Sequence, residues 1–275
     1  MNYLKKYTVF LFALLIFSLC GTAQQTKNGG INLDTTNADG RAAIAITINE
    51  LPGQKFVLEI PEIFTLAQFK GGLFNYSKQL WKFNAKGADM IFKDDKYEYK
   101  IHLKIRRRKQ SIGLAWKITF NNNTRDTLYD LAAFNCWTMN FAPLFKDTLM
   151  ERTFVNDAAG NKIALKNVER IQGEGRRSMQ FYPAGGGIVD LKQSLWISQW
   201  AVIADQHLGG KTISVVSKDA QWLFENIVTG TVAYFFNNWE GDHGCVHASP
   251  LLATKLLPGE SAKASGIFKF TKVKK

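Results

Sequence analysis

Residues 97–108 read Tyr-Glu-Tyr-Lys-Ile-His-Leu-Lys-Ile-Arg-Arg-Arg, and this stretch decides the fold class. As far as Ile105 every second residue is apolar, and the residues between them are polar or charged. Side chains of a β-strand alternate between two faces, so the pattern predicts a strand with one face in a core. The other face carries a row of cationic side chains: Lys100, His102, Lys104 and Arg106, extended by Arg108. Such a face suits a polyanion, although a plain solvated face is the commoner meaning of the pattern.

The neighbouring segments repeat this period. Residues 112–120 alternate in the same way, and Gln110 lies in the short turn between them and the first strand, so the two predict an antiparallel hairpin. Further strands are expected at residues 42–48, 55–60, 127–136, 163–171, 179–182, 194–204, 212–217, 222–225, 230–236 and 262–272. Many short strands, turns rich in Gly, Asn and Asp, and no long amphipathic helix predict an all-β protein. We expect a large antiparallel β-sandwich, of the jelly-roll type or a related one, with little helix.

The first 23 residues have the features of a signal peptide. Lys5 and Lys6 precede a mostly apolar run at 8–19, and Gly21-Thr22-Ala23 supplies small residues for cleavage. Cys20 offers a second interpretation, a lipid anchor. We expect an exported protein, periplasmic or secreted, with a flexible polar leader at 24–40 and a single sandwich domain at 41–275. No other apolar run is long enough to span a membrane.

The charge of the chain is strongly positive. Lys and Arg total 35 against 23 Asp and Glu, a net charge of +12, and removal of the first 23 residues would leave a surplus of ten. Outside a cell this favours acidic polysaccharides, anionic lipid or nucleic acid as partners, unless it serves only solubility. The sequence has no phosphate-binding glycine loop, no Gly-x-Ser-x-Gly, no His-Glu-x-x-His and no nucleic-acid-binding module. An acidic oligo- or polysaccharide is therefore the expected partner, and nucleic acid is not.

Residues 237–250 hold the densest chemistry, two histidines, a cysteine and two carboxylates. Their glycines and closing proline predict a loop. If the loop is extended, His243, Cys245 and His247 fall on one side. A histidine beside Glu240 or Asp242 could transfer protons, the three side chains could bind zinc or copper, or the loop could be purely structural. Because no fourth ligand is evident, we expect no metal.

A second stretch, 134–143, leaves a strand and enters a loop. Asn135, Trp137 and Asn140 would suit a sugar, through ring stacking and amide hydrogen bonds, although a single tryptophan is more often part of a core. In an oxidising compartment Cys136 and Cys245 are a plausible disulfide, and this would bring the two stretches together. The competing interpretation leaves Cys245 as a free thiol or a ligand.

Four motifs carry a resemblance to a known group of proteins. They are Phe-Asn-Cys-Trp at 134–137, Glu-Arg-Thr-Phe at 151–154, His-Gly-Cys-Val-His-Ala-Ser-Pro at 243–250 and Leu-Pro-Gly-Glu at 257–260. In this order they resemble exported β-sandwich proteins of polysaccharide-degrading bacteria, of the galactose-mutarotase-like type, over residues 110–272. The resemblance implies a large sandwich that acts on carbohydrate. Mutarotases pair a histidine acid with a glutamate base; His243 or His247 could be the acid, but no glutamate matches the base.

The leading functional hypothesis is a carbon–oxygen lyase or dehydratase acting on uronic-acid-containing oligosaccharides, without a cofactor. Elimination next to a uronate needs a cation for the carboxylate, a base for the carbon-bound proton and an acid for the leaving oxygen. The expected catalytic residues are His243, His247, Tyr182 and Arg152, and the expected substrate-binding residues are Asn135, Trp137, Asn140, Arg176, Arg177, Trp239 and Glu240. The alternatives are a non-catalytic glycan-binding protein that uses Trp137, Trp239 and the basic face, and a metal-binding exported protein.

Overall fold

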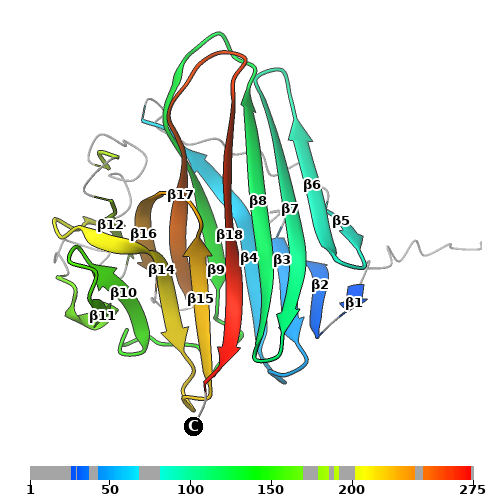
Figure 1. The fold of residues 1–275 in the computed structure, drawn as a ribbon, viewed down its shortest axis with the longest axis vertical. Coiled ribbons are helices and arrows are strands. Elements are labelled where there is room, and N and C mark those ends of the chain that lie inside the picture. The colour runs from blue at the N-terminus through cyan, green and yellow to red at the C-terminus, as the bar shows by residue number, and fades with distance from the viewer. Residues whose placement is uncertain are drawn as a thin grey trace, which may run out of the picture.

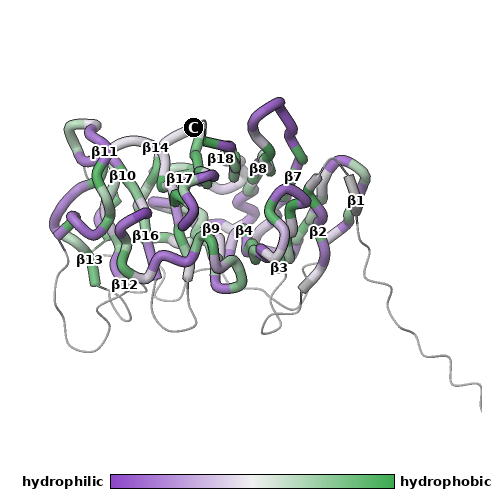
Figure 2. The backbone as a smooth tube through the Cα atoms, turned by 90° about the horizontal axis from the view of Figure 1, so that it is seen from below, coloured by the Kyte–Doolittle hydropathy of each residue, from purple (hydrophilic) through white to green (hydrophobic). Residues whose placement is uncertain are grey.

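Two β-sheets pack face to face, and each contains nine of the strands that the structure describes (Figures 1 and 2). The structure is a computed structural model that describes residues 26–28, 30–36, 43–67, 81–169, 179–185, 189–191, 202–238 and 244–273. Within these ranges the one helical element is a 3₁₀ turn, η1 (Leu165–Asn167). No described helix has the length and apolar character needed to cross a membrane. The predicted fold class, a large and mainly antiparallel β-sandwich, is confirmed.

The strand order defines the two layers. Sheet A runs β1 (Thr26–Asn28), β2 (Ile31–Thr36), β3 (Ala43–Ile48), β4 (Lys55–Thr65), β9 (Leu128–Thr138), β17 (Cys245–Leu256), β16 (Val232–Asn238), β12 (Met179–Pro183) and β13 (Val202–Ile203). Sheet B runs β11 (Lys162–Ala164), β10 (Thr153–Asp157), β14 (Leu208–Val216), β15 (Trp222–Val228), β18 (Ser261–Lys272), β8 (Ser111–Asn122), β7 (Tyr97–Arg108), β6 (Gly87–Lys93) and β5 (Trp81–Asn84). Neighbouring strands pair antiparallel except β12 and β13.

The main core lies between the sheets. Trp137 of β9 is 1 % exposed and packs against the rings of Phe224 and Phe268, which come from sheet B. The apolar face of β7 contributes Ile101 and Leu103 to the same core. Burial of large aromatic and aliphatic side chains supplies about 1.5–3 kcal/mol for each, and this is what holds the two layers together.

A second apolar cluster covers the outer face of sheet A, the face turned away from sheet B. Phe134, Phe181, Tyr234 and Phe236 belong to it and are at most 2 % exposed. Strands β9, β17, β16 and β12 are therefore buried on both faces. This is the setting of the candidate site, because polar side chains on these strands have little access to water.

The antiparallel hairpin predicted for residues 97–120 is confirmed. β7 covers the predicted residues, and the pairing of Arg108 with Ser111 closes the turn to β8. Residues 163–171, in contrast, do not form the expected long strand, because β11 ends at Ala164 and a 3₁₀ turn follows. Most of the strand expected at 194–204 lies outside the described residues, and only β13 is observed there.

Two other expectations are corrected. β1 and β2 fall within the stretch 24–40 that was interpreted as a flexible leader, and Ile31 and Leu33 of β2 are buried. The polar Asn and Thr residues of this stretch favoured a flexible segment, and the sequence pattern therefore did not reveal the hairpin of β1 and β2 at the edge of sheet A. The stretch 237–250 is not one loop either, since β16 extends to Asn238 and β17 begins at Cys245. The signal peptide at 1–23 lies outside the described residues.

Candidate functional site

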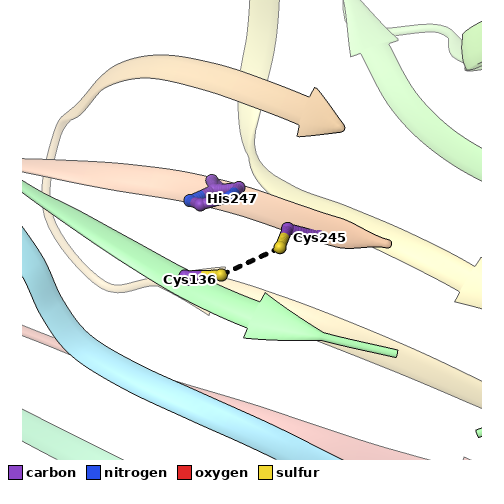
Figure 3. A group of neighbouring side chains, drawn as sticks. All are labelled: Cys136, Cys245 and His247. Carbon is purple, nitrogen blue, oxygen red and sulfur yellow. Dashed lines mark hydrogen bonds between the residues drawn. The ribbon is translucent and has the colours of Figure 1, made fainter. Parts of the chain in front are cut away.

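The candidate site lies on the outer face of sheet A, where β9 and β17 are neighbours. The two strands pair with Cys245 opposite Thr138 and Val246 opposite Trp137. Val246 and Trp137 point into the core, so Cys136, Cys245 and His247 leave the strands on the outer face. Figure 3 shows the three side chains, His247 and Cys245 from β17 and Cys136 from β9. The antiparallel register of the two strands is therefore what assembles the cluster.

The two sulfur atoms face each other without being bonded. Cys136 Sγ lies 3.0 Å from Cys245 Sγ, in a thiol–thiol hydrogen bond, and both residues are free cysteines. A disulfide bond would be about 2.05 Å long. Thr138 Oγ1 lies 3.3 Å from each sulfur. The expected proximity of Cys136 and Cys245 is found, but the expected disulfide is not present in the structure.

His247 is enclosed by aromatic rings. It is 1 % exposed, its ring stacks on Phe134 with centroids 4.1 Å apart, and the ring of Phe236 meets it at 78°. Neither ring nitrogen makes a hydrogen bond of normal geometry in the described part of the chain. An uncompensated polar group costs about 1–3 kcal/mol when buried in a protein. A site that retains one is a candidate for function.

The surroundings of His247 and Cys136 favour the uncharged form of each side chain. The loss of solvation lowers the pKa of His247 from 6.5 to about 3, and the nearby backbone of Asn135 opposes this only weakly. The pKa of Cys136 is raised, first by its hydrogen bond with Cys245, then by burial and by electrostatic interaction with Cys245, Glu62 and Glu59. At neutral pH the imidazole is therefore a free base, and the thiol keeps its proton.

The cluster has the donor types of a soft-metal site. One ligand atom each from Cys136, Cys245 and His247 lie within 4.8 Å of one another. Two thiolates on a tetrahedral zinc ion, with bonds of about 2.3 Å, would lie roughly 3.8 Å apart. The sulfurs are 3.0 Å apart. They would have to separate before an ion could enter, so the observed geometry fits a hydrogen-bonded thiol pair better than a metal site.

Several predicted site residues point away from this cluster. Trp137 belongs to the core between the sheets, so it has no ring face to offer a sugar. Tyr182 is buried in the same core, and its hydroxyl donates a hydrogen bond to Asn237 Oδ1 at 3.2 Å. Asn135 is 0 % exposed, between Phe134 and Cys136 in β9, and leaves the strand on the opposite face from both. Asn140 lies beyond the end of β9, half-buried, in the turn that follows.

Arg152 has a structural task. Its guanidinium donates hydrogen bonds to the backbone carbonyls of Lys146, Leu144 and Val216, the last at 2.6 Å. Its Nη2 also lies 3.8 Å from Asp147. A guanidinium whose donors are used in this way fastens the start of β10 to its neighbours and is not presented to a substrate carboxylate.

The remaining predicted residues, His243, Arg176, Arg177, Trp239 and Glu240, lie outside the described residues. Sequence reasoning also missed two members of the site. Thr138 follows Cys136 by two positions, so the strand period alone could have placed it on the same face. Glu59 lies opposite Cys136 in the pairing of β4 with β9, and only knowledge of that pairing could reveal it.

Comparison with known proteins bears on the fold. No family model and no curated protein matches the chain. Among solved structures, a protein of Escherichia coli K12 provisionally identified as an aldose 1-epimerase is similar, with a TM-score of 0.50, 11 % identity, and coverage of 92 % of this chain and 99 % of that one. A galactose mutarotase related enzyme of Lactobacillus acidophilus is similar with a TM-score of 0.50 and 11 % identity, over 92 % of this chain and 97 % of that one. The Slr1438 protein of Synechocystis sp. PCC 6803 is similar with a TM-score of 0.51 and 9 % identity, over 91 % of this chain and 96 % of that one. The fold is the galactose-mutarotase-like sandwich.

The lyase or dehydratase hypothesis is wrong. Those of its expected catalytic residues that the structure describes do not meet, because Arg152 is tied to carbonyls and Tyr182 faces the core while His247 stacks on Phe134 on the outer face. Two of the three solved structures reported above have names of an aldose epimerase and a mutarotase-related enzyme, and enzymes of these classes are isomerases. The non-catalytic glycan-binding alternative is no better supported, because Trp137 cannot serve as its stacking platform.

Proposed function

We propose that the protein is a sugar isomerase of the aldose 1-epimerase class, which interconverts the two anomers of a free aldose on the outer face of sheet A. The observation that carries the proposal is the pairing of a free-base imidazole, His247, with a protonated thiol, Cys136, on adjacent strands of a sandwich with the mutarotase fold. Anomer exchange needs one proton acceptor and one proton donor. It needs no oxidant, reductant or metal.

Each group is in the state that the first step requires. His247 would accept the proton of the anomeric hydroxyl while Cys136 gives its proton to the ring oxygen. The bond between the anomeric carbon and the ring oxygen breaks, and the anomeric oxygen becomes an aldehyde. Rotation about the neighbouring carbon–carbon bond and the reverse transfers close the ring as the other anomer and restore both side chains.

The surrounding charges favour a neutral aldose. Glu59 and Glu62 raise the pKa of Cys136 through their negative charge, so their field reaches the site. The same field would repel a sugar carboxylate. Because His247 is 1 % exposed, a sugar reaches it only when part of the protein moves aside. Sugar hydroxyls would then replace apolar surroundings and bring both pKa values back towards their ordinary range, where proton transfer is efficient.

Export remains part of the proposal. The apolar run at 8–19 and the small residues before position 24 favour cleavage and a periplasmic or secreted location. Free aldoses released from polysaccharides would be met there. Edman sequencing of protein recovered from the producing cells tests this point, with Gln24 expected at the new N-terminus.

Polarimetry of freshly dissolved α-D-glucose and α-D-galactose tests the activity. The protein is expected to accelerate the approach to anomeric equilibrium, and His247→Gln and Cys136→Ser are expected to reduce the acceleration by about 10²-fold or more. His102→Gln is the matched control, since His102 is exposed on sheet B and paired with Asp89. The proposal fails if neither sugar nor any other common aldose responds, or if folded His247→Gln protein retains the full rate.

A further inference from the structure

A second concave surface lies on the far side of the molecule, on the outer face of sheet B. The core-facing residues of β8 are Ile112, Leu114 and Trp116, so Gly113 and Ala115 face outward. Together with residues of β7, β15 and β18 they line a hollow of about 1130 Å³. Typical small-molecule pockets measure about 300–1,000 Å³, so the hollow can take an extended ligand.

The strand register explains why the surface is hollow. Gly113 lies between Arg106 on one neighbouring strand and Lys269 on the other. Strands are about 4.8 Å apart, so the Cα atoms of Arg106 and Lys269 lie roughly 10 Å from each other, and Gly113 puts no side chain between them. A Cβ on Gly113 would meet the carbonyl oxygen of Phe268 at 2.7 Å. Only glycine fits, and its presence leaves a gap between two cationic walls.

The charge of the hollow is one-sided. Its lining contains Arg106, Arg107, Arg108, Lys109 and Lys269, and none of the described residues that line it is acidic. Two of the five cations are engaged elsewhere, Arg107 with Glu50 and Lys269 with Glu225. Arg106, Arg108 and Lys109 are exposed and have no ion pair in the described part of the chain. Their field is therefore free to act on a ligand.

The apolar bottom of the hollow limits the kinds of anion that it can bind. Ala115, Ile227 and Ile267 form an apolar strip beside the cations, and no aromatic side chain is among the described residues of the lining. Single-stranded nucleic acid is usually held by stacking of bases on aromatic rings, which this floor cannot provide. A flat bilayer cannot reach the bottom of a concave surface. A chain of sugar rings can place carbon–hydrogen faces on the strip and its carboxylates against the walls.

We propose that this hollow binds a linear polysaccharide that carries carboxylate groups. The site is separate from the Cys136–His247 cluster, because the two lie on the outward faces of opposite sheets. Its occupancy does not depend on isomerase activity. It provides a place for the acidic partner that the charge of the chain predicts, away from the negative field of Glu59 and Glu62.

Titration calorimetry of the full protein with a polygalacturonate hexamer tests the proposal. Saturable binding that weakens as salt is added is expected. The variant Arg106→Gln, Arg108→Gln, Lys109→Gln should bind about tenfold or more weakly, since three exposed ion pairs are lost. The control Lys82→Gln, Lys96→Gln, Lys255→Gln removes the same charge from exposed positions outside the lining and should stay within about twofold.

Two further ligands test whether the hollow recognises carboxylate groups on sugar rings. The methyl-esterified hexamer has the same rings without charge and should not bind measurably. A single-stranded oligonucleotide of equal charge should bind more weakly than the polygalacturonate. The proposal is overturned by the absence of binding, by equal losses in the two triple variants, by equal binding of the ester, or by tighter binding of the oligonucleotide. Mutarotation measured in the same preparations should be unchanged in both triple variants if the protein is an isomerase.

Discussion

The imidazole of His247 lies parallel to the phenyl ring of Phe134, with centroids 4.1 Å apart and planes inclined by 13°. The contact joins β17 to β9 on the outer face of sheet A. It places a titratable group where burial favours its neutral form. The stability of the fold is therefore linked to pH through His247.

We expect acid to destabilise the protein through His247. Its pKa is about 3 in the folded protein, against 6.5 as its ordinary value. Between these values the unfolded chain binds a proton that the folded protein does not. The stabilising effect is complete above pH 6.5 and is lost as the pH falls towards 3, by up to about 1.4 kcal/mol per pH unit. Urea unfolding at pH 7.5, 6 and 5 measures it.

The variant His247→Phe isolates this contribution. It keeps an aromatic ring against Phe134 and removes the titration. At pH 7.5 its free energy of unfolding should lie within about 1.5 kcal/mol of the unmodified protein, and it should fall less steeply in acid. Equal slopes for the two proteins would show that His247 does not titrate between pH 7.5 and 5.

Arg152→Ala is expected to lower the free energy of unfolding by about 2–3 kcal/mol. The guanidinium binds three backbone carbonyls, and its removal leaves them without these donors. Its side chain is 26 % exposed, so water replaces part of the loss. Arg125→Ala, at an exposed position, should change stability by less than about 0.5 kcal/mol. Loss of mutarotation from folded Arg152→Ala protein would contradict a purely structural role.

One rule determined how much of the fold could be predicted from the sequence: side chains along a strand alternate with a period of two. It gave β7 and β8 correctly because one face of each is apolar and the other is polar. It did not reveal β17, since Val246 and Ala248 pack into the core while Cys245, His247 and Ser249 are buried on the other face. A strand buried on both faces shows no alternation between water and core.

The same rule explains the mixed outcome for the site. It placed Cys245 and His247 on one side of the chain, and the structure agrees, because their ligand atoms lie within 4.8 Å of each other while Val246 between them packs into the core. It could not say that Tyr182 faces the core or that Arg152 binds carbonyls, because both depend on which strand lies beside which. Glu59 entered the site only through the pairing of β4 with β9. The alternation of side chains along a strand determines the face on which a residue lies. The order of strands in the sheet determines which residues lie beside it.

Trp137→Ala is expected to cost about 3–5 kcal/mol of stability. The indole is 1 % exposed and packs against Phe56, Phe224 and Phe268 from both sheets. Trp222→Ala should cost less, because Trp222 is only half-buried. Chemical denaturation of both variants provides the comparison. A stable Trp137→Ala protein that loses sugar binding would instead make Trp137 part of a binding surface.

Oxidation of the thiol pair links stability to the proposed activity. Cys136 Sγ and Cys245 Sγ are 3.0 Å apart and their residues are 109 positions apart in sequence. Diamide, which takes up two hydrogens, should join them in a disulfide that closes a long loop and raises the free energy of unfolding by up to about 4 kcal/mol. The bond would also consume the thiol that donates a proton to the sugar.

Mutarotation should therefore fall on oxidation and recover with dithiothreitol, and Cys245→Ala protein should keep its activity in diamide. Two thiols still titratable by Ellman's reagent in the denatured, diamide-treated protein would contradict the prediction.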